Sequence, residues 1–324
     1  MKKRILIIHT GGTIAMAEDI ATGAVKPSAD HPLKNIMDTL NQWADITEIE
    51  YLNVPSPHMQ PKDMFELSKF IKQKFADGQF DGAVVTHGTD TLEETAYFLD
   101  LVLNLEEPIV VTGSMRSSNE PGYDGPPNLI ESVKTAASDE ARGNGVLVVL
   151  NDEIHTAKNV TKTHTSNVAT FQSPQFGPIG IVTKSGVFFH HHRIERDFYN
   201  IHNLSKKTTL LKTYAGMEPD LIQSVGEKGY DGLVIEALGQ GNLPPAVVPE
   251  IKKLIDQGLP VVIVSRCFNG IVQDVYGYEG GGKQLKSMGV IFSNGLNGPK
   301  ARLKLMIALE KTKDPKELQD IFLR

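Results

Sequence analysis

The sequence predicts an α/β protein, with a doubly wound, mostly parallel sheet in a larger N-terminal domain and a smaller α/β domain after it. In the first half of the chain, short apolar runs alternate with apolar patterns of helical period, and the same alternation starts again near residue 208. Alternating strands and helices form βαβ units, whose helices cover both faces of a mostly parallel sheet. A chain of 324 residues also favours two domains over one.

The first series of elements defines the N-terminal domain. Apolar runs predict buried strands at 4–9, 46–53, 81–86, 108–112 and 145–150, and helical patterns lie near 33–43, 61–76, 91–104 and 127–139. In the second helix, Met64, Leu67 and Ile71 share one face, and Pro61 suits the first turn. The stretch 153–190 is richer in β-branched and polar residues and predicts hairpin strands. We therefore place this domain at residues 1–190.

The second series defines a smaller, flavodoxin-like α/β domain. It predicts strands at 208–214, 231–236, 260–264 and 289–292, and helices near 219–228, 245–257 and 298–310. Residues 191–207 are rich in His, Arg, Asn and Lys and contain few apolar residues, so we expect a linker there. The C-terminal domain is accordingly predicted at 208–324.

Composition excludes several classes of protein. The formal net charge of −6 is small for this length and argues against a nucleic-acid partner. The single cysteine, Cys267, permits no internal disulfide, which fits a reducing compartment. No window approaches the roughly 20 apolar residues of a membrane span. We expect a cytoplasmic protein with no membrane partner.

The N-terminus resembles a secretory signal only superficially. Residues 2–4 are basic and residues 15–17 are small or apolar, but the apolar core between them is limited to 5–8. A signal peptide needs a core of roughly 7–15 residues. We expect a first strand here.

Two similar segments carry the strongest functional signal. The segments 7–13 and 84–91 each contain an apolar strand that leads into glycine and an exposed threonine, Thr13 and Thr89. Ligands of open α/β sheets bind beyond the carboxyl ends of the strands, so two such turns can bring two hydroxyls into one crevice. A threonine becomes a useful nucleophile when a neighbouring base activates it. With the adjacent Asp90, the two motifs predict covalent acyl transfer.

Both motifs resemble those of the bacterial-type asparaginase/glutaminase family, which consists of amidohydrolases. The motifs are Thr10–Ala15 and His87–Thr91, and further matches lie at 111–116, 160–163, 239–243 and 296–302. They occur in family order from residue 5 to near residue 320, so the resemblance covers essentially the whole chain.

The resemblance implies a catalytic set. Thr13 would be the nucleophile that forms an acyl-enzyme, and Thr89, Asp90 and Lys162 would form a proton relay. Each residue also has a simpler interpretation. Thr13 could close a turn, and most lysines are solvated, although Lys162 lies in a hydroxyl-rich segment, 160–167, that can surround an ammonium with acceptors. Asp90 with Glu93, or Thr91 with Glu94, has capping-box spacing, which is compatible with catalysis.

The resemblance also implies substrate contacts. Ser56 matches the serine of the loop that holds the substrate α-carboxylate, but Pro57 stands where the family usually has a side-chain donor. Asp90 could bind the α-ammonium group, and we assign Thr89 and Ser114 to the same substrate site.

Three further positions concern activation and assembly. The family's mobile N-terminal loop usually brings a tyrosine over the nucleophile, but residues 22–27 contain none, and Tyr123 is the candidate substitute. Asn242 matches an asparagine that reaches a neighbouring subunit's site. The glutamate that accompanies it in the family is not clearly placed: direct alignment gives Tyr276, and Glu279 lies three residues on.

Two other segments imitate known sites. The run 277–284 resembles a phosphate-binding loop, but Gln284 replaces the required Ser or Thr, so we expect a solvent-exposed glycine turn. Consecutive strand residues point to opposite faces, so the histidines 190–192 do not predict a metal site.

The resemblance, together with the two Gly-Thr motifs, thus implies an L-asparaginase that hydrolyses L-asparagine to L-aspartate and ammonia, with glutamine hydrolysis left open as a minor activity. We expect no cofactor or metal, and the resemblance implies a homodimer or homotetramer. Relatives that act on glutamine carried by tRNA have extra N-terminal sequence, whereas this chain starts at its first strand. The alternative is a non-enzymatic sensor that binds an amino acid or nucleotide, although no Gly-x-Gly-x-x-Gly motif follows the first strand. Ammonia release from asparagine would distinguish the two.

Overall fold

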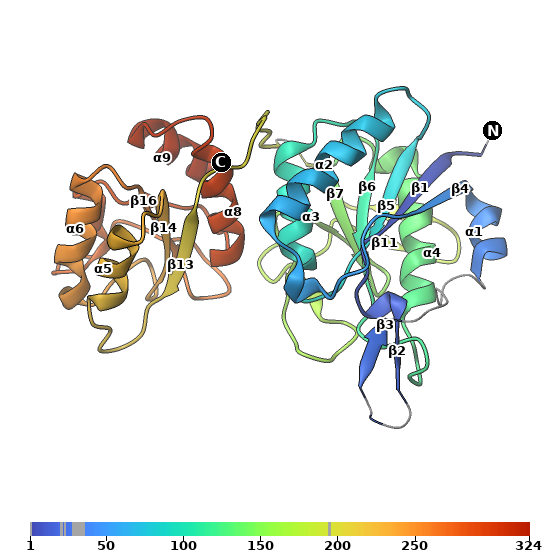
Figure 1. Cartoon of the computed structure of the whole chain (residues 1–324), viewed down its shortest axis with the longest axis horizontal. Coiled ribbons are helices and arrows are strands. Elements are labelled where there is room, and N and C mark those ends of the chain that lie inside the picture. Colours follow the sequence, from blue (N-terminus) through green and yellow to red (C-terminus); the bar gives the residue numbers. More distant parts are fainter. Residues whose placement is uncertain (1, 20–21, 23, 28–35, 194–195) are drawn as a thin grey trace. The chain divides into compact units, whose positions relative to one another are not determined.

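The chain folds into two compact units. The computed structural model describes residues 2–19, 22, 24–27, 36–193 and 196–324, and Figure 1 traces them along the chain. The units are Met1–Phe198 and Tyr199–Arg324. The division falls inside the segment 191–207, whose role as a linker stays a prediction.

The first unit is built on one eight-stranded sheet, in the order β12-β11-β8-β7-β6-β5-β1-β4. Its parallel strands are β1 (Arg4–His9), β4 (Asp45–Glu50), β5 (Gly82–Thr86), β6 (Ile109–Thr112) and β7 (Val146–Leu150). The antiparallel strands β8 (Glu153–Thr156), β11 (Gly180–Val182) and β12 (Val187–Phe189) extend the sheet beyond β7. Hairpin strands in 153–190 were expected from the β-branched and polar composition there, and the structure confirms them.

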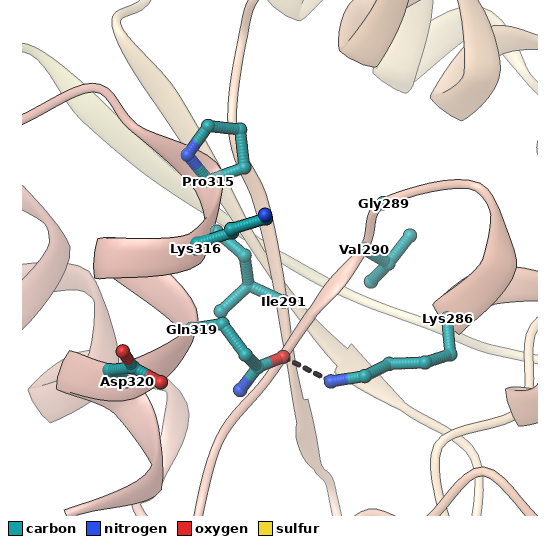
Figure 2. A pocket seen from close by; sticks show the side chains of 8 residues that line it. All are labelled: Lys286, Gly289, Val290, Ile291, Pro315, Lys316, Gln319 and Asp320. Carbon is teal, nitrogen blue, oxygen red and sulfur yellow. Dashed lines mark hydrogen bonds between the residues drawn. The ribbon is translucent and has the colours of Figure 1, made fainter.

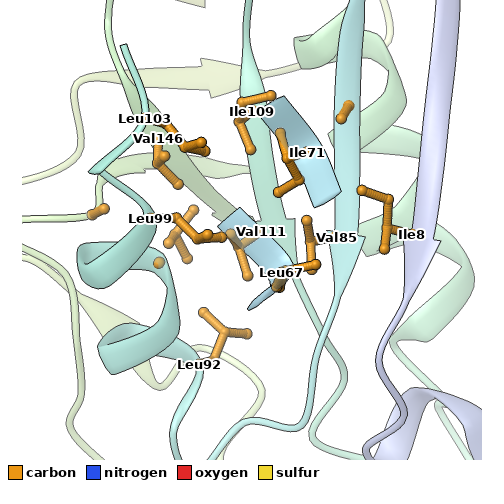
Figure 3. Close-up of a cluster of buried hydrophobic side chains, with 14 of the residues drawn as sticks. Ile8, Leu67, Ile71, Val85, Leu92, Leu99, Leu103, Ile109, Val111 and Val146 are labelled. Carbon is orange, nitrogen blue, oxygen red and sulfur yellow. The ribbon is translucent and has the colours of Figure 1, made fainter. Parts of the chain in front are cut away.

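Helices cover both faces of this sheet. Apolar side chains of α2 (Pro61–Phe75) and α3 (Leu92–Val102) pack on one face, where Figure 3 shows them meeting the strand residues Val85, Ile109 and Val111. Residues of α1 (Met37–Trp43) and α4 (Gly125–Ala136) pack on the other face. The doubly wound arrangement is therefore confirmed. Helix α2 begins at Pro61, as expected. Residues 33–35, where the sequence predicts the start of the first helix, lie outside the described residues.

Several short elements had no sequence signal. The hairpin β2 (Met16–Glu18) with β3 (Val25–Pro27) and the pair β9 (Thr161–Lys162) with β10 (Phe171–Gln172) have strands of two or three residues, too short to show a period. Single 3₁₀ turns lie at η1 (Thr13–Ala15), η3 (Ser56–His58) and η4 (Asp139–Ala141).

The second unit is a smaller parallel α/β fold, as predicted. Its sheet has the order β13 (Thr208–Lys212), β14 (Gly232–Ala237), β15 (Val261–Ser265) and β16 (Ile291–Phe292). Its helical elements are α5 (Asp220–Glu227), η5 (Pro245–Val247), α6 (Val248–Asp256), α7 (Gly282–Ser287), α8 (Gly298–Ala308) and α9 (Pro315–Leu323). The core contains Ile222, Ile251 and Leu285 from α5, α6 and α7.

One prediction in this unit was wrong. The glycine-rich run at 277–284 is not wholly a solvent-exposed turn, because Gly280, Gly281 and Gly282 are buried and Gly282 begins α7. The amide of Leu243 donates to the carbonyl of Gly280, so the backbone of this run packs against a neighbouring segment. None of the helices that the structure describes has both the length and the hydropathy of a membrane-spanning segment.

Candidate active site

The two Gly-Thr motifs end neighbouring parallel strands. Strand β1 pairs with β5, and His9 lies opposite Thr86 at their carboxyl ends. Thr10 continues the contact, since its backbone amide and its hydroxyl both donate to the Thr86 carbonyl, at 3.1 and 2.8 Å. The segments that follow therefore leave the sheet from the same edge.

Glycine allows these two segments to touch. Gly12 has a φ of 85°, and a Cβ atom built on it would lie 2.3 Å from the backbone nitrogen of Gly88. Real side chains do not tolerate such a contact, so only glycine fits at position 12. Thr13 follows directly and begins η1, and Thr89 follows Gly88. The contact brings together the turns that carry the two predicted catalytic threonines.

The Ser56 turn joins them from the end of β4. Ser56 is buried, and its hydroxyl accepts a hydrogen bond from the Asp90 amide at 3.2 Å. In return, the Thr91 hydroxyl donates to the Ser56 carbonyl at 2.8 Å. These bonds fix the Ser56 turn to the Thr89–Asp90 turn.

Lys162 reaches this site from β9. Its Nζ donates to Thr89 Oγ1 at 2.9 Å and to Asp90 Oδ1 at 2.7 Å. The side chain of Lys162 is 16% exposed, whereas that of Asp90 is 59% exposed. One end of the Lys162–Asp90 pair is thus enclosed by protein, and the other faces outward where a ligand can bind.

Glu93 is a site residue that sequence reasoning interpreted differently. Its Oε1 accepts from the Thr161 hydroxyl at 3.0 Å and from the Lys162 amide at 3.3 Å. The capping interpretation was wrong for Thr91, which precedes α3 without a side-chain cap bond and whose hydroxyl donates to the Ser56 carbonyl. The available signal was its position three residues after Asp90, in the first turn of the predicted helix.

His87 is a second contributor that the sequence did not single out. It is completely buried, and its Nδ1–H donates to the Gly88 carbonyl at 2.8 Å, because a carbonyl can only accept. Its Nε2 therefore accepts from the Thr95 hydroxyl at 2.9 Å. Burial lowers the pKa of His87 to about 4. A neutral imidazole in one tautomer thus holds the peptide that precedes Thr89.

Ser114 and Tyr123 both lie after the end of β6. Ser114 is buried and its hydroxyl donates to the Arg116 carbonyl at 2.7 Å. The Tyr123 hydroxyl donates to the Ile14 carbonyl at 2.6 Å, one residue after Thr13. Burial, assisted by the neighbouring Asp124 carboxylate, raises the pKa of Tyr123 well above its usual value.

The remaining predicted residues belong to the second unit. Asn242 is half-buried, and its Oδ1 accepts from the Gly282 amide at 3.3 Å. Tyr276 and Glu279 are exposed on the segment that leads to Gly282. Asn242 thus tethers the segment on which both candidates lie.

The second unit also has a hollow of about 400 Å³ that contains none of the predicted site residues. Figure 2 shows it between the start of α9 and the end of α7, where Lys286 donates to Gln319. Among the described residues, no group of three or more His, Cys, Asp or Glu side chains is placed to hold a metal ion.

Comparisons with known proteins cover the whole chain. Residues 4–195 match the family model described as "Asparaginase, N-terminal", and residues 207–322 match "Glutaminase/Asparaginase C-terminal domain". The chain is 39% identical to a probable L-asparaginase of Deinococcus radiodurans, over 98% of this chain and 97% of the relative. It is 35% identical to an L-asparaginase of Bacillus licheniformis, over 97% and 98%.

A solved structure agrees with these matches. The crystal structure of a probable cytoplasmic L-asparaginase from Campylobacter jejuni superposes with a TM-score of 0.90 at 36% identity, over 100% of both chains. Sequence identity at this level, together with both family models and the shared fold, shows that the chain belongs to the asparaginase family.

Proposed function

We propose that the protein hydrolyses L-asparagine to L-aspartate and ammonia through an acyl-enzyme on Thr13. The Thr13 oxygen attacks the side-chain amide carbon, the C–N bond breaks, and the nitrogen leaves as ammonia after it gains a proton. Water then attacks the resulting ester, releases aspartate and restores the Thr13 hydroxyl. No cofactor takes part in either step.

The observation that carries this proposal is the bonding of Lys162. Its amine contacts Thr89 Oγ1 and Asp90 Oδ1 together, next to the turn that carries Thr13. A hydroxyl, an amine and a carboxylate within hydrogen-bond reach can pass a proton between the nucleophile, the leaving group and water. We assign Thr89, Asp90 and Lys162 to this relay.

Substrate binding follows from the same turns. The exposed Asp90 carboxylate supplies a negative charge for the α-ammonium group while one of its oxygens contacts Lys162. Ser56 and the backbone around it are assigned to the α-carboxylate, with Pro57 in η3 limiting the shape of that loop. Ser114, whose hydroxyl donates to the Arg116 carbonyl, is assigned to the same substrate site. Glutamine would be a poorer substrate, because this site must accommodate one more methylene group.

The proposed test follows the chemistry directly. Purified protein is incubated with asparagine, and ammonia and aspartate are measured. Acid quenching during turnover followed by peptide mass spectrometry should reveal a mass increase equal to asparagine minus ammonia on the peptide that contains Thr13. Turnover with the adduct on another residue would reject Thr13 as the nucleophile, and the absence of turnover would reject the activity. We place the reaction in the cytoplasm.

We further propose that the enzyme works as a homodimer or homotetramer in which Asn242 and Glu279, or Tyr276 in place of Glu279, serve a neighbouring subunit's site. Exposed apolar side chains in the second unit support self-association, with Phe268, Val275 and Tyr278 exposed by 66%, 60% and 54%.

The shared site can be tested by mixing two inactive variants. Asn242→Asp keeps the oxygen that accepts from the Gly282 amide, so the segment before Gly282 stays in place. It removes the side-chain N–H donors that would contact the neighbouring subunit's site. Co-refolding Asn242→Asp with Thr13→Ala should restore activity above either parent, because some hybrid sites contain neither lesion. If verified hybrids show no rescue although Asn242→Asp alone is impaired, each site belongs to one chain.

A further inference from the structure

The segment that follows Thr13 is bound along its length by the loop 114–124. The Ile14 carbonyl accepts from the Tyr123 hydroxyl at 2.6 Å, and the Met16 carbonyl accepts from the Ser118 amide at 3.0 Å. Glu18 is bound twice by the Asn119 side chain, through its amide and its carbonyl, each at 2.7 Å. Every second residue of the segment is thus held, as in a strand pair.

The loop itself is fixed to α4. Both oxygens of Asp124 accept backbone amides, from Met115 at 3.0 Å and Arg116 at 2.9 Å, and Asn128 of α4 donates to the same carboxylate at 3.1 Å. The Asp124 carboxylate therefore ties both ends of the loop to the start of α4.

The Tyr123 side chain binds the residue that directly follows the proposed nucleophile, since its hydroxyl donates to the Ile14 carbonyl. Its ring lies against Gly125, where an added Cβ would come within 2.3 to 2.5 Å of the ring carbons and hydroxyl oxygen. Its hydroxyl must be protonated to donate to a carbonyl, and the direction of its pKa shift agrees with this. Among the described residues, no hydrogen bond joins Tyr123 to Thr13.

We propose that Tyr123 is a positioning residue for Thr13. It holds the Ile14 carbonyl, fixes the 3₁₀ turn Thr13–Ala15, and so sets where the Thr13 hydroxyl points relative to the Thr89 turn. This rests on the proposed role of Thr13 as the nucleophile. It differs from the direct activating role considered from the sequence, since the Tyr123 hydroxyl acts on the backbone and not on the nucleophile.

The test compares Tyr123→Phe with the wild type, and uses Asn119→Ala as a control in the same loop that releases Glu18, five residues beyond Thr13. A misplacement of about 1 Å can cost about 10²-fold in rate. We expect Tyr123→Phe to lower kcat by roughly 10- to 100-fold, to leave KM within about threefold, and to keep the pH midpoint of kcat. Asn119→Ala should change kcat by less than about threefold.

A second measurement does not depend on activity. Hydrogen exchange of the peptide covering residues 13–18 should be at least about fivefold faster in Tyr123→Phe, with other peptides of the first unit unchanged. Gly125→Ala, which displaces the ring but keeps the hydroxyl, should reproduce both effects if Tyr123→Phe folds poorly. If the wild type lacks asparaginase activity, the proposed function fails, and the exchange data still decide whether Tyr123 holds this turn.

Three results would overturn the proposal. Unchanged kcat with unchanged exchange would mean that the bond to Ile14 does not matter. Tyr123 would instead be a direct acid or base if Tyr123→Phe removed a midpoint from the pH profile of kcat and lowered kcat by much more than about 100-fold, while hydrogen exchange of residues 13–18 stayed normal. A raised KM with normal kcat would make it a substrate contact.

Discussion

Replacing Asp100 with asparagine should destabilise the first unit without touching the proposed chemistry. Asp100 lies on α3, is 1% exposed, and accepts from Arg193 Nη1 with both oxygens at 3.0 and 2.7 Å. Its Oδ1 also accepts from the Val146 amide at 3.0 Å. Asparagine retains an oxygen for Val146 but takes away the carboxylate that balances the charge of Arg193, whose side chain is only 11% exposed.

The size of the effect follows from this geometry. Removing one member of a buried ion pair typically costs about 3–5 kcal/mol. Because the substituted asparagine can still bind the Val146 amide and the Arg193 side chain retains some water, the lower end applies, about 3 kcal/mol. With a urea slope of about 1–3 kcal/mol per M, the midpoint of unfolding should fall by at least about 1 M.

Trp43, the only tryptophan of the chain, makes the assay specific for the first unit, because it lies on α1. Its fluorescence is followed during urea unfolding of the wild type, Asp100→Asn and Glu66→Gln. Glu66 pairs with Lys69 in the same unit, but both side chains are about half exposed, at 47% and 50%. This exposed control should change stability by less than about 0.5 kcal/mol.

A double-mutant cycle identifies the responsible contact. If the pair itself matters, Arg193→Met should be destabilising in the wild type and much less so in Asp100→Asn, with a coupling of at least about 1.5 kcal/mol. An Asp100→Asn midpoint that matches the Glu66→Gln control, or simple additivity in the cycle, would refute the reasoning.

Three further outcomes are expected. Thr13→Ala should reduce ammonia release by at least about 10³-fold while the Trp43 transition stays in place, and near-normal release would exclude Thr13 as the nucleophile. Asparagine should be preferred over glutamine by at least roughly tenfold in kcat/KM, and equal values for the two amides would contradict the site as assigned. Burial raises the pKa of Glu131 from 4.5 to about 7, so the folded state binds the extra proton between these values and wild-type stability falls as pH rises through them. Glu131→Gln keeps an acceptor for the Asp152 amide but does not titrate. The fall in unfolding free energy between these pH values should therefore be smaller in the variant by about 1–2 kcal/mol, after allowance for solvent screening. Parallel plots of unfolding free energy against pH for the two proteins would contradict this.

The sequence predicted the strands and long helices well because their signals are local. Runs such as Ile5–Ile8 and Val146–Leu150 are buried on both faces and read as continuous apolar stretches. Helices α7 and α9 were missed: α7 has six residues in a glycine-rich run, and α9 has only nine near the chain end. Both are too short for the apolar period of a helix to be distinct in the sequence.

The site was predictable where a motif places a residue at a strand end. The meeting of the Thr13 and Thr89 turns required only that β1 and β5 be neighbours. The partners of Glu93 and Tyr123 were not predictable, because the bonds join residues 68 and 109 positions apart through short segments without a pattern. The buried ion pair between Asp100 and Arg193 could not be predicted either, because the two residues are far apart in the sequence. Arg193 also lies in the segment 191–207, whose polar composition predicts a linker.

The position of helix α3 predicts two classes of substitution in this enzyme, which differ in their effect on the reaction rate. Thr89 and Asp90 immediately precede it, and Glu93 in its first turn holds the strand that carries Lys162. The groups of the proposed relay are thus held together around the start of α3, while the proposed nucleophile, Thr13, follows β1 and is held by the loop 114–124. A small shift of the Thr13 turn would change the distance over which the proposed nucleophile gives up its proton, but would leave the hydrogen bonds within the proposed relay in place. Variants should therefore separate into those that slow the reaction at every pH, through the contacts of the Thr13 turn, and those that move its pH dependence, through the contacts of Lys162.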